Sequence, residues 1–271
     1  MSKAQSSNAL SAAPFFSQRA DGAFVGNDPA RGPWSPDHCH AGPVTGLVAR
    51  AAEQAVGPGK MLTRLTLDIL RPLPLAGLWV VAETTRHTRT LATTSVTVHD
   101  DDGTLCVRAS SMHLVEKDLG QVPTAPVTPL LLEEATPGDF TIGAGLHDRP
   151  YFGQFLDVAY PPGAGFGPGP KAMWMRTTTL LEGEEQSPIQ SLCALADCGN
   201  GISWNARPAE MGFMNTDLTL HVHRAPESDW LASDSVSHWH GTGIGMSQSV
   251  LQDTKGPVAT ALQTLVLHPP T

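Results

Sequence analysis

The sequence predicts an α+β fold made of two copies of one unit, joined head to tail. The segment TRLTLDILR at 63–71 returns as TDLTLHVHR at 216–224, an offset of 153 residues (216 minus 63). The same offset relates two sets of residues: Leu65, Thr66, Leu67, Arg71, Asp100, Gly103 and Leu114 match Leu218, Thr219, Leu220, Arg224, Asp253, Gly256 and Leu267. Each half places one helical pattern before several alternating segments, which is typical of an α+β domain. An internal repeat of this kind predicts two repeats with the same fold.

The first half contains one predicted helix and one predicted antiparallel sheet. After Gly42 and Pro43, apolar residues recur at helical spacing: Val44, Leu47, Val48, Ala51, Ala52 and Ala55. Gly57 and Pro58 end this helix. A short strand is expected before it, at 23–27. The alternating pattern then predicts strands at 61–71, 77–87, 90–99 and 104–116, with a hairpin turn at 99–103.

The second half repeats this plan after a connecting segment. We assign residues 1–118 to the N-terminal repeat, 119–150 to a linker rich in Pro and Thr, and 151–271 to the C-terminal repeat. Ser187 is the predicted N-cap of the second helix, with Pro188 in its first position. Strands are expected at 154–160, 172–180, 212–224, 229–238, 243–252 and 257–268.

Composition excludes several classes of protein. The net charge of −9 argues against a nucleic-acid partner, which requires basic patches. No apolar run approaches the 18 residues of a membrane span, and the first residues lack the apolar core of a signal peptide. We therefore expect a globular protein of the cytoplasm.

No metal site and no cofactor are expected. The cysteines show no C-x-x-C spacing, so we interpret them as buried free thiols: Cys39, Cys106, Cys193 and Cys198. Histidines occur in pairs two residues apart, which on a strand point to one face: His38 with His40, His221 with His223, and His238 with His240. Zinc requires three or four ligands, and no neighbouring cysteine or carboxylate completes such a set.

Three segments resemble a known family. HAGPVTGLVARAAE at 40–53 and SPIQSLCALADCGNG at 187–201 are similar to the central helices of the double hot-dog acyl-CoA thioesterases of type II, the TesB-like family. The closing strands of that family resemble residues 214–231 and 243–267. The resemblance implies that each sheet wraps around its helix, and that the chain hydrolyses an acyl-CoA. It also implies a homodimer of double hot-dogs.

The resemblance implies a catalytic set of an Asp, a Ser or Thr, and a Gln that together orient a water molecule. The Asp matches Asp217 and the Gln matches Gln263. Thr242, Ser237 and Ser235 are the candidates for the hydroxyl group. A carboxylate can accept a proton from water, and a neutral amide can hold the water without competing for that proton.

The two copies differ at these positions. At the offset of 153 residues, Asp217 corresponds to Arg64 and Gln263 corresponds to Ser110. The first copy therefore lacks both groups, and we expect the site to belong to the second copy.

Three further residues are candidates for substrate binding. Gly42 opens the first helix, where free backbone N–H groups can hold a thioester oxygen. His40 stands beside it, at the expected mouth of the pocket. Asp197 ends the second helix, where the helix dipole disfavours a carboxylate, so it needs a partner or contacts the substrate.

Two other functions remain open. A hot-dog hydratase or dehydratase pairs a His with an acidic residue near the central helix, but Glu53 lies off the apolar stripe and should face away from the substrate. A non-catalytic acyl- or lipid-binding module would keep the groove without needing Asp217 or Gln263. A serine hydrolase is disfavoured because no G-x-S-x-G motif occurs.

Overall fold

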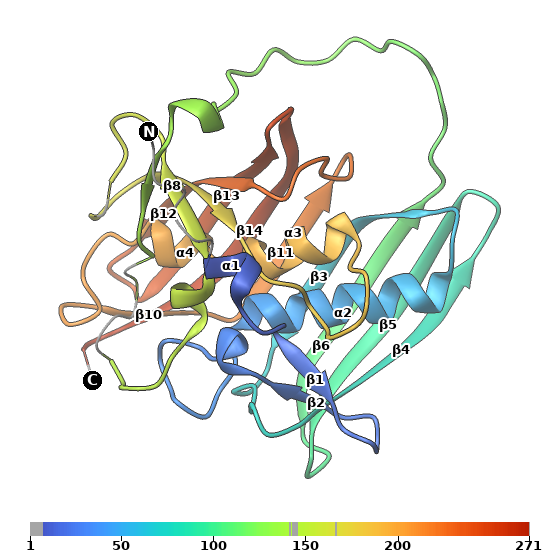
Figure 1. Ribbon diagram of the computed structural model, residues 1–271, viewed down its shortest axis with the longest axis horizontal. Helices are drawn as coiled ribbons and strands as arrows, with labels where there is room; N and C mark the ends of the chain where they lie inside the picture. Colours follow the sequence, from blue (N-terminus) through green and yellow to red (C-terminus); the bar gives the residue numbers. More distant parts are fainter. Residues whose placement is uncertain (1–7, 141, 143–145, 166, 271) are drawn as a thin grey trace.

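The computed structural model describes residues 8–140, 142, 146–165 and 167–270 (Figure 1). The helices are α1 (Asn8–Ser11), α2 (Ala41–Val56), α3 (Pro188–Ala196) and α4 (Gly199–Ile202), with 3₁₀ turns η1 (Asp28–Ala30), η2 (Leu132–Glu134) and η3 (Phe152–Phe155). The strands of the first half are β1 (Phe16–Gln18), β2 (Phe24–Gly26), β3 (Met61–Ile69), β4 (Leu78–His87), β5 (Leu91–Asp100) and β6 (Leu105–Leu114). Those that follow are β7 (Thr136–Gly138), β8 (Asp157–Tyr160), β9 (Lys171–Arg176), β10 (Gly212–Asn215), β11 (Asp217–Val222), β12 (Leu231–Trp239), β13 (Ile244–Asp253) and β14 (Gly256–His268).

All of these strands form one continuous sheet. Its order is β1-β2-β4-β5-β6-β3-β11-β14-β13-β12-β9-β8-β7, and β10 also pairs with β14. The two halves meet where β3 and β11 pair antiparallel. There Thr66 lies opposite Thr219, and Leu65 and Leu67 lie opposite their partners Leu220 and Leu218. Thr66 and Thr219 are related by the repeat offset, so an approximate two-fold axis passes between them. This arrangement confirms the predicted duplication.

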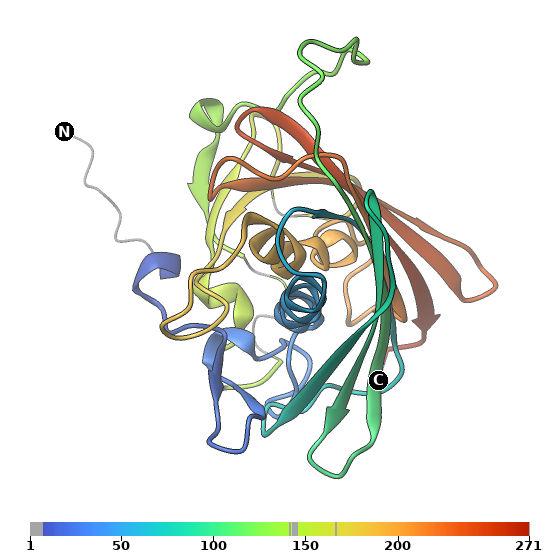
Figure 2. The same cartoon turned by 90° about the vertical axis from the view of Figure 1, so that its right-hand side faces the viewer.

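The helices α2, α3 and α4 lie on the inner face of this sheet. Figure 2 shows α2 nearly end-on, with the sheet curving around it. The side of α2 that meets the sheet is buried, as at Val44, Leu47 and Val48. A helix enclosed by an antiparallel sheet in each half is the double hot-dog fold that was predicted.

Small residues allow α2 and α3 to approach closely. A Cβ atom on Gly42 would lie 2.2 Å from the carbonyl oxygen of Ala194. One on Gly46 would lie 3.0 Å from the Leu180 side chain and 3.4 Å from the carbonyl oxygen of Gln190. These contacts make the two helices antiparallel neighbours at the centre of the molecule.

Several helix ends and hairpin turns predicted from glycine and capping residues agree with the structure. Gly57 ends α2 with φ of 76°, a conformation that only glycine adopts without strain. Gly103 and Gly256, which the repeat equates, both occupy hairpin turns with positive φ. The Ser187 hydroxyl accepts a hydrogen bond from the Gln190 backbone N–H, so Ser187 is the N-cap of α3, as predicted.

Two segments differ from expectation. The strand predicted at 212–224 is divided at Thr216 into β10 and β11, both of which pair with β14. The segment predicted as a linker crosses the molecule as a long loop (Figure 1, green), but it also contains η2 and β7. Since β7 pairs with β8, part of that segment belongs to the sheet.

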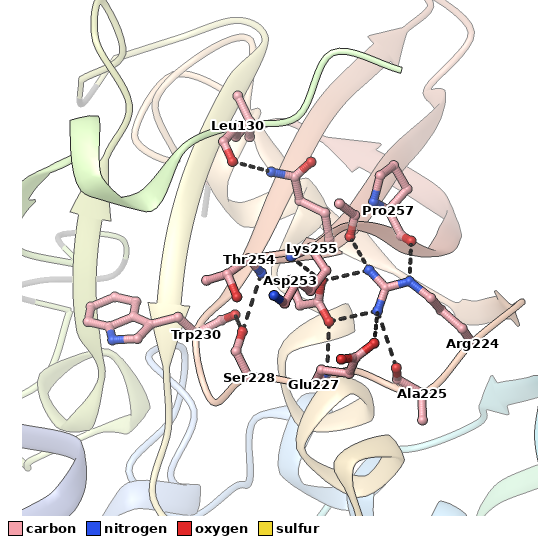
Figure 3. Close-up of polar contacts among 12 residues, drawn as sticks. Leu130, Arg224, Ala225, Glu227, Ser228, Trp230, Asp253, Thr254, Lys255 and Pro257 are labelled. Atoms are coloured by element: carbon pink, nitrogen blue, oxygen red, sulfur yellow. Dashed lines mark hydrogen bonds and ion pairs between the residues drawn. The ribbon is translucent and has the colours of Figure 1, made fainter. Parts of the chain in front are cut away.

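An ion pair with a buried carboxylate links two loops of the second half (Figure 3). Asp253, whose side chain is fully buried, accepts hydrogen bonds from both terminal nitrogens of Arg224 at 2.8 and 2.6 Å. The backbone N–H groups of Glu227 and Lys255 donate to the same carboxylate. Burial alone would raise the pKa of Asp253, but these hydrogen bonds prevail and lower it. The network ties the connection between β11 and β12 to the β13–β14 hairpin.

Other expectations concern thiols and membranes. All four cysteines are buried and free, as predicted. None of the helices within the described residues is long and apolar enough to cross a membrane.

Candidate active site

Gln263 and Asp217, which the family resemblance pairs, lie on opposite faces of the sheet. Gln263 is buried on the inner face of β14, whereas the next residue, Thr264, is exposed. Asp217 accepts a hydrogen bond from the Thr264 backbone N–H at 2.7 Å, and its neighbour Leu218 is the residue that points inward. Because successive residues of a strand face opposite sides, the expected Asp217–Gln263 pair is not assembled.

The hydroxyl candidates are also occupied elsewhere. Thr242 is exposed in the turn between β12 and β13, where its hydroxyl lies 3.0 Å from a ring nitrogen of His240. Ser237 and Ser235 are buried on the inner face of β12, and each bonds another serine hydroxyl at 2.8 Å. None of the three has a hydrogen bond to Gln263.

The carboxylate beside Gln263 is that of Asp197. Asp197 is the C-cap of α3 and is only 5% exposed. The Gln263 amide nitrogen donates to its Oδ1 at 2.9 Å and to its backbone oxygen at 3.1 Å. Asn215, at the end of β10, donates to the same Oδ1 at 2.8 Å. The structure therefore brings together two of the predicted site residues, in a pair that the sequence analysis did not propose.

The first residues of α2 complete this cluster from the other half of the chain. His40 is the N-cap of α2, and its Nδ1 accepts a hydrogen bond from the Gly42 backbone N–H at 3.1 Å. The same nitrogen lies 3.4 Å from Asp197 Oδ2. The ring stacks on Phe152 with centroids 4.3 Å apart. His40, Gly42, Asp197 and Gln263 thus form one centre at the junction of the two repeats.

Burial makes this centre electrostatically unusual. It raises the pKa of Asp197 to about 7, even though hydrogen bonds from Asn215, Gln263 and the Gly42 backbone act to lower it. Burial also lowers the pKa of His40 to about 4. Near neutral pH, His40 is therefore uncharged, and Asp197 keeps its proton to a higher pH than an exposed carboxyl group does. A carboxyl group with such a pKa is suited to general-base catalysis.

The amide nitrogen of Gln263 has no hydrogen left with which to hold a water molecule. The amide oxygen accepts from the Asn200 backbone N–H at 3.0 Å, and the nitrogen is committed to Asp197. The amide instead fixes the orientation of the carboxylate. Asp197 Oδ2 faces His40 Nδ1, and the Gly42 backbone N–H also acts on this carboxylate.

Sequence reasoning missed Ser247. It lies opposite Gln263 in the register of β13 and β14 and is 1% exposed. Its hydroxyl has no hydrogen-bond partner among the described residues. Gly199, at the start of α4, packs against Ser247 and Gln263 because it has no side chain. A Cβ atom there would lie 3.2 Å from both Ser247 Oγ and Gln263 Oε1. A signal was present in the alternating serines of GMSQSVL, where a buried strand would normally present apolar residues.

Glu53, which was expected to face away from the substrate, lies on the side of α2 that contacts α3. Both of its carboxylate oxygens lie 2.9 Å from the Ser187 hydroxyl, and the Gln190 amide nitrogen donates to one of them at 2.8 Å. The face of α2 that lies off the sheet packs against the start of α3, and this contact covers Glu53.

The cluster does not have the composition of a metal centre. Among the described residues, no group of three or more His, Cys, Asp or Glu side chains is placed to hold a metal ion.

Two family models match the chain. The model of the acyl-CoA thioesterase N-terminal domain matches residues 30–114, and that of the acyl-CoA thioesterase C-terminal domain matches residues 129–267. No curated protein sequence matches at a significant level.

Solved structures share the fold along nearly the whole chain. A putative thioesterase from Novosphingobium aromaticivorans has a TM-score of 0.70 at 21% identity, covering 94% of this chain and 99% of that one. A putative thioesterase II from Thermobifida fusca has a TM-score of 0.72 at 14% identity, covering 93% and 95%. The acyl-CoA thioesterase II TesB2 from Mycobacterium marinum has a TM-score of 0.61 at 18% identity, covering 94% and 95%. At these identities the likeness establishes the fold.

Proposed function

Because this chain belongs to the acyl-CoA thioesterase family and is a thioester hydrolase, we propose that it hydrolyses an acyl-CoA to the free acid and CoA at the centre around Asp197. The observation that carries this proposal is a buried carboxyl group with a pKa near 7, held by Gln263 and Asn215. This assignment replaces Asp217 with Asp197 as the base and retains Gln263.

Asp197 Oδ2 accepts a proton from a water molecule, whose oxygen attacks the thioester carbonyl carbon. The carbon–sulfur bond then breaks, and the CoA sulfur takes the proton from Asp197. Ser247 offers a hydroxyl without a partner beside Gln263, which can help to place the water. Backbone N–H groups at the start of α2 stabilise the charge on the carbonyl oxygen.

The first test replaces the base. Asp197→Asn keeps the shape of the side chain and removes its ability to accept a proton, so kcat should fall about a hundredfold or more. The measurement is release of free thiol from acyl-CoAs of graded chain length. Asp217→Asn is the matched control, because it changes a carboxylate on the outer face and should leave kcat nearly unchanged. Loss of turnover in the control alone would contradict the assignment.

The contact between His40 and Asp197 also favours a second candidate, hydration or dehydration of an acyl-CoA. Such enzymes need a His and an acidic residue at one site, and here their nearest polar atoms are 3.4 Å apart. Product analysis with an enoyl-CoA separates the two reactions, since hydration yields a hydroxyacyl-CoA and releases no thiol. A non-catalytic acyl-binding module would yield neither product.

A further inference from the structure

The crossing of α2 and α3 places a carboxylate beside each helix start. At one end, Asp197 lies beside the N-cap of α2, His40. At the other end, Glu53 lies beside the N-cap of α3, Ser187. The two carboxylates do not occupy equivalent positions along their helices. Glu53 lies 13 residues after the N-cap of α2 (53 minus 40), whereas Asp197 lies 10 residues after the N-cap of α3 (197 minus 187). The two ends are nevertheless related by the axis that relates the repeats.

Each carboxylate is held by the amide of a glutamine. Gln263 donates to Asp197 at 2.9 Å, and Gln190 donates to Glu53 at 2.8 Å. The glutamines come from different elements, since Gln263 lies on β14 and Gln190 on α3. The junction of the two repeats thus has a second carboxylate–amide pair, with Glu53 from the first repeat and Gln190 from the second.

The second pair has an open hydrogen-bonding position that the first lacks. Gln263 Oε1 accepts a backbone N–H, whereas Gln190 Oε1 is buried and has no partner among the described residues. Gln190 is 7% exposed, and a buried acceptor without a donor is costly unless something else supplies the donor. Glu53 is only half-buried, so solvent can reach its carboxylate.

The charge on Glu53 is not neutralised by the nearest arginine. Arg50, one turn earlier on α2, is engaged by Glu184 through two hydrogen bonds of 2.6 and 2.7 Å. Burial raises the pKa of Glu53, and the hydrogen bonds from Gln190 and Ser187 offset part of this effect. The carboxylate is therefore more basic than one in water.

We propose that Glu53 and Gln190 form a second water-activating centre, which hydrolyses the same class of acyl thioester. This proposal rests on the function proposed above. One hydrogen of the water is donated to Gln190 Oε1 and the other to Glu53. Glu53 takes the second proton as the water oxygen bonds to the carbonyl carbon. The carbon–sulfur bond then breaks, and the leaving thiolate takes this proton from Glu53, which restores the carboxylate.

The kinetic test removes the first centre and then the second. Asp197→Asn should leave a residual rate of thiol release with butanoyl-CoA or palmitoyl-CoA. Adding Glu53→Gln should lower that residual rate about a hundredfold, as loss of a general base does. Adding Glu182→Gln instead is the matched control, an exposed carboxylate in the segment before α3, and should leave it unchanged. A residual rate that Glu53→Gln does not alter overturns the proposal.

A second variant covers the case in which Glu53→Gln misfolds. Gln190→Met has nearly the same shape and keeps the carboxylate but removes the open acceptor, so it should lower the residual rate as well. Circular dichroism checks that each variant is folded. An unchanged residual rate in a folded Gln190→Met protein counts against the second centre.

Binding stoichiometry separates this proposal from the proposed function. Titration calorimetry of the unchanged protein with S-butyl-CoA, a thioether that cannot be hydrolysed, should find two molecules bound per chain. One molecule per chain overturns the second centre, even if the enzyme is active. If the protein hydrolyses no thioester, the proposed function fails, and two bound molecules would still support a ligand site at Glu53 and Gln190.

Discussion

At the scale of single residues, burial and hydrogen bonding act in opposite directions on Asp197. Burial disfavours the charged form, while donors from Asn215, Gln263 and the Gly42 backbone favour it. The balance leaves the pKa about three units above that of a carboxyl group in water. His40 cannot donate a proton from Nδ1, because that nitrogen already accepts the Gly42 N–H. The environment that suits Asp197 to the proposed role of base also makes it sensitive to pH.

We predict that kcat/KM rises with pH through about 7 and is level above it, because only ionised Asp197 accepts a proton. Initial rates between pH 5 and 9 measure this. The contribution of Asp197 to the free energy of unfolding should instead fall as pH rises. A carboxyl group whose pKa is raised by folding stabilises the protein fully below its unfolded pKa, and this contribution is lost as pH rises through the folded pKa. A flat rate profile would contradict the assignment of Asp197 as the base.

The variant Gln263→Ala tests whether the Gln263 amide positions the Asp197 carboxylate. Gln263→Ala removes a donor to Asp197 and leaves the Asn200 N–H without an acceptor. It should destabilise the fold by about 1–3 kcal/mol, and it should move the pH midpoint of kcat/KM upward. Denaturant unfolding and the rate profile measure the two effects. Ser110→Ala is the control, since Ser110 is exposed on β6 and should change neither quantity. An unchanged midpoint in Gln263→Ala would show that the amide does not act on the carboxylate.

At the scale of elements, the crossing of α2 and α3 determines the site. Gly42 touches the carbonyl of Ala194, three residues before Asp197, so the distance between the helices also sets the distance between His40 and Asp197. Close approach of the helix backbones therefore serves the chemistry as well as the packing.

We predict that Gly42→Ala both destabilises the protein and slows it. The added Cβ would lie 2.2 Å from a backbone oxygen, so the helices must separate. Overpacking of this kind typically costs about 1–3 kcal/mol. Gly241→Ala is the control, because a Cβ there meets no atom within 4 Å. Chemical denaturation and acyl-CoA turnover measure the two effects, and a Gly42→Ala protein as stable and active as the control would contradict this account.

At the scale of the whole molecule, apolar side chains collect on the outer face of the second half. On β13 and β14, Ile244 pairs with Val266, which in turn pairs with Met214 of β10. Ile244 is 62% exposed and Met214 is 57% exposed, and Met246 and Leu262 extend the same face. Exposed apolar patches of this kind mark interaction surfaces.

We therefore predict that a second copy of the chain covers this face, giving a homodimer of double hot-dogs. Light scattering at micromolar concentration should report twice the chain mass of 28.7 kDa. Ile244→Lys should return the protein to the monomer mass. Val81→Lys is the control, because Val81 is equally exposed on β4 of the other half and should not affect assembly. A monomer in the unchanged protein would refute the prediction.

The limits of the repeat can be seen on the last strand of each half. An offset of 153 residues equates Gln263 with Ser110, yet Gln263 is buried and Ser110 is exposed, while Ser111 is the buried residue. Register irregularities occur in β3 and β13, so the pairing is not uniform along the sheet. Because a shift of one residue moves a side chain to the other face, a constant offset is not enough to equate inward positions.

The sequence by itself determined the duplication, the order of the two central helices and the long strands, and the helix ends at Ser187 and Gly57. These features depend on local periodicity, capping and turn conformation, which neighbouring residues specify. Only the tertiary structure decided which carboxylate meets Gln263. Asp217 and Leu218 differ by one position in a strand, and alternation alone does not say which of them points inward. His40 and Asp197 are distant in sequence, and they meet because two glycine-containing helices cross at the junction of the repeats.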